Sequence, residues 1–218
     1  MLFPHHPILI RGGGDLATGV AYRLRKAGFP IIVLELPHPL VVRRRVALAT
    51  AVLEGEILVE DLRGVLVQSA AAAWAVAQSG DVPVLVAPRL PGEPLAEPFA
   101  IVDARMVKVN IDTTIDQAPL VIGLGPGFTA GEDCHAVIET MRGHTLGRAI
   151  WQGMAIPNTG TPGIVAGKGA ERVLRAPVDG IANWGKDIGD RVVAGERIGA
   201  VGGEAIVAPF DGVLRGLI

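Results

Sequence analysis

The sequence predicts an α/β protein, with a Rossmann-like, mostly parallel sheet domain followed by a small C-terminal β module. Three observations support this prediction. An apolar run at residues 8–10 breaks into three glycines and then into helix-forming residues, which is typical of a strand, a tight turn and a helix. β-Branched runs then alternate with alanine-rich segments as far as about residue 125, as in a doubly wound sheet. The last part of the chain instead holds short predicted strands, Gly-Asp turns and an internal repeat.

The length and composition fit two domains. Half of the 218 residues are hydrophobic, so the chain can bury a sizeable core. We expect the α/β domain to cover residues 1–165 and the β module residues 170–218. The net charge of −2 gives no electrostatic reason to expect nucleic acid or an anionic membrane as a partner.

The single cysteine, Cys134, limits the chemistry that the chain can support. It excludes an internal disulfide and any multi-cysteine zinc or iron–sulfur site, and we expect no metal site. The first residues lack the pattern of a secretory signal, and no uncharged apolar run reaches membrane-spanning length. We therefore expect a soluble protein of the cytoplasm.

Residues 7–36 have the length and order of one βαβ unit, with Gly28 closing its helix. Gly12, Gly14 and Ala17 fit the Gly-x-Gly-x-x-Gly/Ala pattern, and the second predicted strand ends in Glu35. In this Rossmann fingerprint the first glycine allows the turn, the second lets a phosphate approach the backbone, and the small third residue lets helix and strand pack closely. An acid at the end of the second strand binds a ribose hydroxyl. These residues and Gly13 are candidate ligands of a dinucleotide such as NAD.

Two charged residues beside the glycines complicate an NAD site. Asp15 lies in the first turn of the predicted helix, where its charge suits the helix dipole but repels a phosphate unless the residue is the N-cap. Arg11 ends the first strand, offsets that repulsion and is itself a candidate contact for an anion. A nucleotide-type ligand and a purely structural βαβ turn remain alternatives.

The next elements follow from local patterns. The three adjacent arginines, 43–45, cannot all face one ligand on a helix, and one of them is a candidate to close over an anion at the glycine loop. Ser69 is the predicted N-cap of an alanine-rich helix that runs to Ser79. The other predicted elements are a helix ending at Glu54-Gly55, strands at 57–59, 65–67, 82–87 and 100–107, and a surface loop at 88–98.

A second glycine loop repeats the opening theme. The apolar run at residues 119–124 leads into Gly125 and Gly127. If this strand is parallel to the first, both glycine loops lie at the carboxyl edge of the sheet, where open α/β sheets bind ligands. A tight turn with no ligand is the alternative interpretation of these two glycines.

Polar residues are densest just after this loop. Arg142, His144 and Arg148 are interspersed with glycines and are candidate contacts for an anion, with solvated loop charges as the alternative. Cys134 next to His135 suggests an activated thiolate, but adjacent side chains diverge on a strand or a helix. A small buried hydrophobic residue is the competing interpretation of Cys134.

Beyond a linker-like stretch at residues 158–163, a repeat marks the C-terminal module. The segment at residues 175–181 recurs at 207–213, with Ala-Pro-x-Asp-Gly in both copies. This module resembles the barrel-sandwich hybrid of biotinyl and lipoyl domains. The hairpin between the halves, at residues 201–206, has no lysine to carry biotin or lipoate, so we expect a scaffold or docking role.

Taken together, the motifs resemble the YqeB-type accessory proteins of selenium-dependent molybdenum hydroxylases. The resemblance covers nearly the whole chain, in the segments 10–19, 37–44, 125–128, 138–148 and 212–218. Family members continue beyond the last of these motifs, so the resemblance implies that the chain stops early and that its β module lacks a closing strand or is completed by a partner.

The resemblance implies a maturation role. The cofactor candidates are then a molybdopterin-type ligand or a dinucleotide, held by the glycine loops and the arginines, and the partners are the molybdenum hydroxylase apo-enzyme or other maturation proteins. A chalcogen carried on Cys134 is a further hypothesis. The alternatives are an NAD-linked oxidoreductase that uses Glu35 at the ribose, or a non-catalytic binding module with a vestigial nucleotide site. The oligomeric state is left open, a homo-oligomer included.

Overall fold

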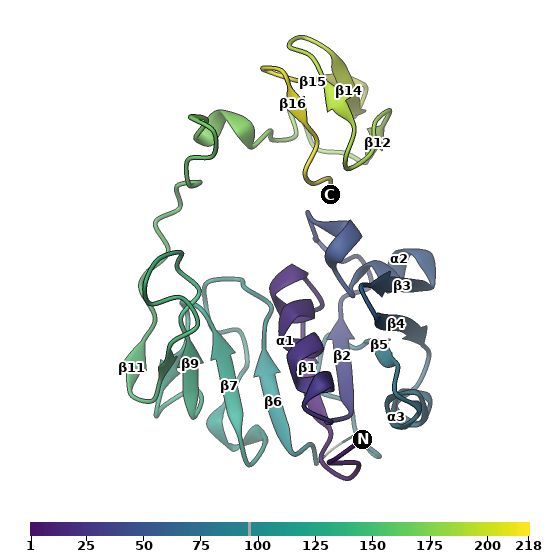
Figure 1. Ribbon diagram of the computed structural model, residues 1–218, viewed down its shortest axis with the longest axis vertical. Coiled ribbons are helices and arrows are strands. Elements are labelled where there is room, and N and C mark those ends of the chain that lie inside the picture. The colour runs from purple at the N-terminus through teal and green to yellow at the C-terminus, as the bar shows by residue number, and fades with distance from the viewer. Residues whose placement is uncertain (96) are drawn as a thin grey trace. The chain divides into compact units, whose positions relative to one another are not determined.

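The computed structural model describes residues 1–95 and 97–218 of the chain (Figure 1). These residues form two compact units, one from Met1 to Asn158 and one from Thr159 to Ile218. Each unit has its own hydrophobic core, and each is described by itself.

Unit 1 is built on a nine-stranded sheet with the order β10-β9-β7-β6-β1-β2-β5-β4-β3. The seven strands that lie from β9 across to β4 in this order all run parallel to one another. The edge strand β3 is antiparallel to β4, and the edge strand β10 is antiparallel to β9. The predicted mostly parallel α/β sheet is therefore confirmed. The strands are β1 (Ile8–Arg11), β2 (Ile31–Glu35), β3 (Glu56–Val59), β4 (Leu62–Val67), β5 (Val82–Val86), β6 (Ala100–Asp103), β7 (Val121–Leu124), β9 (Ala136–Ile138) and β10 (Ala149–Ile150).

Helices cover both faces of this sheet. On one face, α1 (Asp15–Lys26) and α2 (Thr50–Glu54) pack against side chains such as Ile8 and Ile10 of β1. On the other face, α3 (Ala70–Ser79) packs against Leu9, which points the opposite way because side chains alternate along a strand. The core thus lies in two layers, with the sheet between them (Figure 1).

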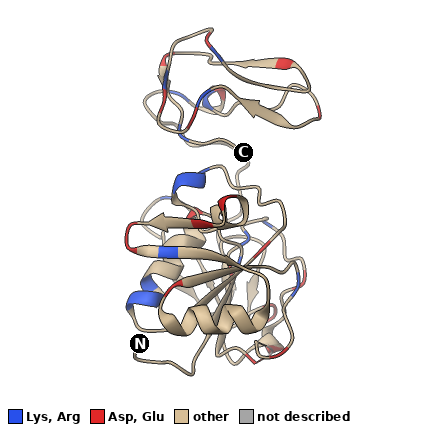
Figure 2. Cartoon of the chain, turned by 90° about the vertical axis from the view of Figure 1, so that its right-hand side faces the viewer, with Lys and Arg blue, Asp and Glu red and all other residues tan. Residues whose placement is uncertain are grey.

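The alanine-rich helix forms as predicted. The Ser69 Oγ accepts a hydrogen bond from the Ala72 N–H at 3.2 Å, and the helix ends at Gly80, whose φ of +108° is left-handed. Figure 2 shows α3 without a Lys, Arg, Asp or Glu along its length. Its small side chains allow close packing on the sheet.

Two predicted elements differ from the observed ones. The helix expected before Gly55 is only α2, preceded by a 3-10 turn, η1 (Arg44–Val46). The strand expected over residues 100–107 ends at Asp103, because the Arg105 N–H turns back to the Asp103 carboxylate and the chain then passes through left-handed backbone at Met106 and Lys108. The crossover from β6 to β7 contains only a second 3-10 turn, η2 (Ile115–Gln117).

The rest of unit 1 is a short pair of strands outside the main sheet. β8 (Thr129–Ala130) pairs with β11 (Gly153–Met154) in antiparallel fashion. A small cluster around Val121, Phe128 and Cys134 joins this pair to the sheet.

Unit 2 is a small all-β module apart from one 3-10 turn, η3 (Ala170–Arg172). Its sheets are the three-stranded order β12-β14-β15 and the pair β13-β16, all antiparallel. The barrel-sandwich arrangement stays a prediction. The strands are β12 (Ala182–Trp184), β13 (Arg191–Val192), β14 (Arg197–Val201), β15 (Glu204–Val207) and β16 (Gly212–Val213). Within the described part of the chain, the helices are all too short or too polar to cross a membrane.

Candidate functional site

The sheet order places a ligand crevice between β1 and β6. The six strands β5-β2-β1-β6-β7-β9 follow the order 3-2-1-4-5-6 of dinucleotide-binding sheets, in which the switch point lies between the first and fourth strands. β1 and β6 are those two strands here, and their last residues, Arg11 and Asp103, are register partners. The glycine loop follows β1 directly, so it lies at this switch point.

Two of the three glycines in the loop are required by the packing of the protein itself. Gly12 has a φ of +88°, and a Cβ on it would lie 3.0 Å from the Cα of Arg105. A Cβ on Gly13 would lie 2.8 Å from the backbone nitrogen of Ala49, whose N–H donates to the Gly13 carbonyl. These two glycines therefore let segments from elsewhere in the chain close on the loop.

Gly14 is different, because none of the residues that the structure describes occupies the space at its side-chain position. A Cβ there would meet no atom within 4 Å, and its φ of −64° is accessible to any residue. Gly14 is also the N-cap of the twelve-residue helix α1, and no side chain of the described residues caps that end. The first turn of such a helix presents N–H groups and a positive dipole end, which attract an anion.

Charged side chains flank this helix end. Asp15 is the first helical residue rather than the cap, and its carboxylate pairs with the Arg43 guanidinium. One of the three adjacent arginines thus reaches the loop, and it neutralises the acid that would repel a phosphate. Ala17 is fully buried in the core, as the close packing of α1 on the sheet requires.

Glu35 contacts the loop directly. Its Oε1 accepts the Gly13 N–H at 2.8 Å and its Oε2 accepts the Leu36 N–H at 2.6 Å. The side chain is buried, with 8% of its surface exposed. Both carboxylate oxygens are therefore held by the protein backbone beside the loop.

Arg11 is buried in an ion-pair network instead of facing solvent. Its guanidinium donates to Asp112 at 2.8 Å and to the Thr113 Oγ1 at 3.1 Å, and it is 3% exposed. Hydrogen bonding from Arg11 and Arg105 holds the pKa of Asp112 below its usual range. The positive charge of Arg11 is thus balanced within the protein.

The same network contains residues that the sequence analysis did not select. Asp103 is fully buried and accepts bonds from Arg105 and from the Thr113 hydroxyl, at 2.5 Å each. Burial lowers the pKa of Arg105, but its hydrogen bonds and ion pairs with Asp103 and Asp112 have the larger effect, so the pKa of this arginine is raised. The signal in the sequence that could have pointed to this network was Asp103, an acid within a predicted buried strand.

The second glycine loop lies at the same edge of the sheet as the first. It follows β7, which is two strands away from β1, or about 10 Å at the usual distance between neighbouring strands. A Cβ on Gly125 would lie 2.5 Å from the Thr140 Oγ1, and one on Gly127 would lie 2.7 Å from the carbonyl carbon of Lys108. Both have positive φ. The fold itself therefore requires these glycines.

Lys108 beside this loop is another residue that the sequence analysis missed. Its backbone is left-handed, with a φ of +69°, and burial lowers the pKa of its amine. Among the described residues it has no ion-pair partner, whereas Lys26 and Lys186 pair with acids. Left-handed backbone in a residue other than glycine is uncommon, and the sequence gives no signal of it.

The three predicted cationic residues lie in the exposed loop from β9 to β10. Arg142, His144 and Arg148 are all exposed there. Glu139, by contrast, is 2% exposed and anchors the loop by accepting the N–H groups of Met141 and Ile156. Because β9 is parallel to β1, the loop leaves from the same edge of the sheet as the two glycine loops.

Cys134 and His135 do not form a catalytic pair. Cys134 is fully buried in an apolar cluster, and burial raises the pKa of its thiol. The His135 Nδ1 accepts the N–H of Val121 at 3.0 Å. A buried thiol with a raised pKa is a poor nucleophile, so the geometry favours the small buried hydrophobic residue over the chalcogen carrier.

No protein-family model and no solved structure matches the chain. A curated relative does: the uncharacterized protein YqeB of Escherichia coli strain K12 is 46% identical over 223 aligned positions, which include the whole of this chain. The chain spans 41% of the length of that relative. The expected resemblance to a YqeB-type protein is thus found over the whole of this chain.

Proposed function

We propose, from the YqeB family membership that the whole-length similarity supports, that this chain binds a phosphate-bearing nucleotide or molybdopterin-type ligand at Gly14. The proposal further assigns it an accessory role in the maturation of a selenium-dependent molybdenum hydroxylase. The observation that carries the ligand proposal is Gly14 itself, whose missing side chain leaves open space at the uncapped end of α1. The accessory role rests on the motifs shared with YqeB-type proteins.

The surrounding charges favour a phosphate over a neutral ligand. The backbone N–H groups of the first turn supply donors, and Arg43 lies within ion-pairing reach of the same turn. When a phosphate binds, Arg43 can exchange its contact with Asp15 for the stronger negative charge of the ligand.

The position of Glu35 argues against an NAD-linked oxidoreductase. Such an enzyme uses the acid at the end of the second strand to bind a ribose. Here each oxygen of Glu35 already accepts a backbone N–H. A ribose must therefore share or displace these contacts.

The loop proposal is tested by thermal shift with NAD, CTP and a molybdopterin-type ligand. A ligand at 100 times its dissociation constant stabilises by about 2.7 kcal/mol, which is easily measured. Gly14→Ala is expected to abolish the shift because its methyl group fills the space that the phosphate needs. Gly19→Ala, on the exposed middle of the same helix, also adds a methyl group in open space and is expected to keep the shift. An undiminished shift in Gly14→Ala would sink the assignment, and a shift by NAD alone that Glu35→Gln removes would support the oxidoreductase instead.

The accessory role is tested in a host that makes such a hydroxylase. Loss of the gene is expected to lower hydroxylase activity while the amount of hydroxylase polypeptide stays the same. The Gly19→Ala variant should restore activity, and Gly14→Ala should not. Normal activity without the gene would contradict the maturation role, whatever the loop binds.

A further inference from the structure

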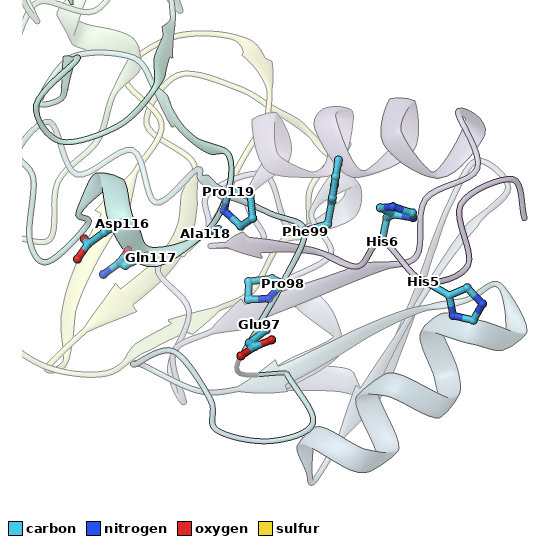
Figure 3. A pocket seen from close by; sticks show the side chains of 9 residues that line it. All are labelled: His5, His6, Glu97, Pro98, Phe99, Asp116, Gln117, Ala118 and Pro119. Carbon is cyan, nitrogen blue, oxygen red and sulfur yellow. The ribbon is translucent and has the colours of Figure 1, made fainter.

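A cavity lies at the edge of the same sheet that is opposite the glycine loops. It has a volume of about 650 Å³ and is lined by nine residues: His5, His6, Glu97, Pro98, Phe99, Asp116, Gln117, Ala118 and Pro119 (Figure 3). These residues come from the three segments that lead into β1, β6 and β7. The cavity is therefore at the amino ends of these parallel strands, away from the glycine loops at their carboxyl ends.

One end of the cavity is aromatic. The His6 and Phe99 rings meet edge to face, with centroids 4.8 Å apart, and Phe99 also stacks on Phe29 at 6.0 Å. Although it is held by these contacts, Phe99 keeps 38% of its surface exposed. Pro98 and Pro119 lie between this end and the other (Figure 3). A fixed aromatic ring with rigid neighbours suits a flat ligand.

The other end carries acceptors. Figure 3 shows Asp116 and Gln117 side by side there, with Glu97 between them and the aromatic end. The Thr114 hydroxyl donates to Asp116 at 2.5 Å and lowers the pKa of that carboxyl, so it stays ionised. Glu97 has no ion-pair partner within the described part of the chain. Two carboxylates therefore face a cavity whose described lining contains no lysine or arginine.

Gln117 adds an unmet acceptor. Its Nε2 donates to the Asp112 carbonyl at 2.7 Å, and because a carbonyl only accepts, this contact fixes which side of the amide is the oxygen. The Oε1 is buried and has no hydrogen-bond partner among the described residues. This unpaired acceptor belongs to a residue that lines the polar end of the cavity.

We propose that this cavity is a binding site for a planar cation, an aromatic ring bearing an amidinium- or guanidinium-like group. The flat ring packs against Phe99, and the cationic N–H groups lie toward Glu97 and Asp116. The negative lining excludes phosphates and carboxylates from this site. Its ligand is thus opposite in charge to the one proposed for the glycine loop, and the two sites are independent.

The test uses benzamidine, an aromatic amidinium, and benzoate, which has the same ring and the opposite charge. Titration calorimetry of the full chain at pH 8 is expected to show saturable binding of benzamidine at millimolar concentrations or below, and none of benzoate. Glu97→Gln and Asp116→Asn are each expected to weaken benzamidine binding roughly tenfold, the effect of one charged hydrogen bond. Both residues are exposed, so both variants should fold.

Two control variants test whether benzamidine binds in this cavity and not elsewhere on the surface. Glu132→Gln removes an exposed acid that does not line the cavity and should leave benzamidine binding unchanged. Gly14→Ala should also leave it unchanged, whether or not the glycine loop binds a phosphate. The proposal is overturned if benzamidine does not bind, if benzoate binds as well, or if neither carboxylate variant weakens binding.

Discussion

At the scale of single residues, Glu35 and Arg11 lie beside the glycine loop, but the side chains of both are already engaged by other parts of the protein. Glu35 was predicted beside the glycine loop from the spacing of one βαβ unit, and it does contact Gly13. The partner of Arg11 is Asp112, which is 101 positions away. Such a contact depends on β6 lying next to β1, and no local pattern reveals that. The sequence therefore predicted the position of Arg11 but not its ion pair.

Glu139 makes a residue-scale prediction about acid stability. Burial raises the pKa of its carboxyl, but the N–H groups of Ile156, Met141 and Thr140 outweigh burial and hold the pKa below its usual range. With a lower pKa in the folded state, the stabilisation is complete above about pH 4.3, the ordinary value of Glu, and is lost as the pH falls through the folded value. Glu139→Gln is expected to destabilise by about 1–3 kcal/mol at pH 7, because one oxygen acceptor and the charge are lost.

The measurement is urea unfolding at pH 7 and at pH 3. The difference between wild type and Glu139→Gln should shrink at the lower pH, since the stabilisation that comes from the lowered pKa declines below about pH 4.3. The exposed Glu132→Gln should differ from wild type by less than about 0.5 kcal/mol at both. A difference for Glu139→Gln that does not change with pH would show that its charge plays no part.

At the scale of elements, predictions from local signals were accurate, and those that depend on tertiary contacts were not. The boundaries of α3 follow from Ser69 and Gly80, which act within one turn of the helix. The end of β6 does not follow from a local signal. Asp103 turns the chain there by accepting the Arg105 N–H, and its side chain is held in a buried hydrogen-bond network. An apolar pattern continues past this point and gives no sign of the turn.

The cap of α3 provides the element-scale prediction. Ser69→Ala removes the side-chain acceptor that caps that helix end and should destabilise unit 1 by about 1 kcal/mol. Ser69→Asp keeps an acceptor and should retain most of the stability. Ser79→Ala, at the other end of the same helix, loses only an exposed bond to the Val76 carbonyl and should have a smaller effect. Thermal unfolding followed by circular dichroism measures all three, and equal losses at both ends would contradict a specific capping role.

At the scale of the whole molecule, the chain consists of two units that differ in how far apart in the sequence their paired strands lie. Unit 1 is held by strands far apart in sequence, whereas unit 2 pairs strands that are close neighbours or nearly so. The alternating apolar and helical segments were sufficient to predict the first, and the internal repeat the second. The strand connections within unit 2 were beyond prediction, because its short strands carry little periodicity.

The exposed segment at the start of unit 2 predicts where proteases cut. Residues 157–175 are mostly exposed, and Lys168, Arg172 and Arg175 all fall within it. Limited trypsin digestion should cleave there first and leave a fragment that contains the nine-stranded sheet, whereas Arg11, buried in β1, should resist. Mass spectrometry of the first fragments checks this outcome. Initial cleavage within β1 or β6 would contradict the division into units.

The position of β1 between β2 and β6 also sets the order of events during synthesis. Ile8 pairs with Ile31 on one side and with Ala100 on the other. At a typical rate of about 5–20 residues per second, the first neighbour emerges from the ribosome within a few seconds, but the second is made roughly 3–14 seconds later. Until then one side of a strand with three consecutive apolar residues, Ile8, Leu9 and Ile10, has no partner, which makes the nascent chain a natural client for chaperones.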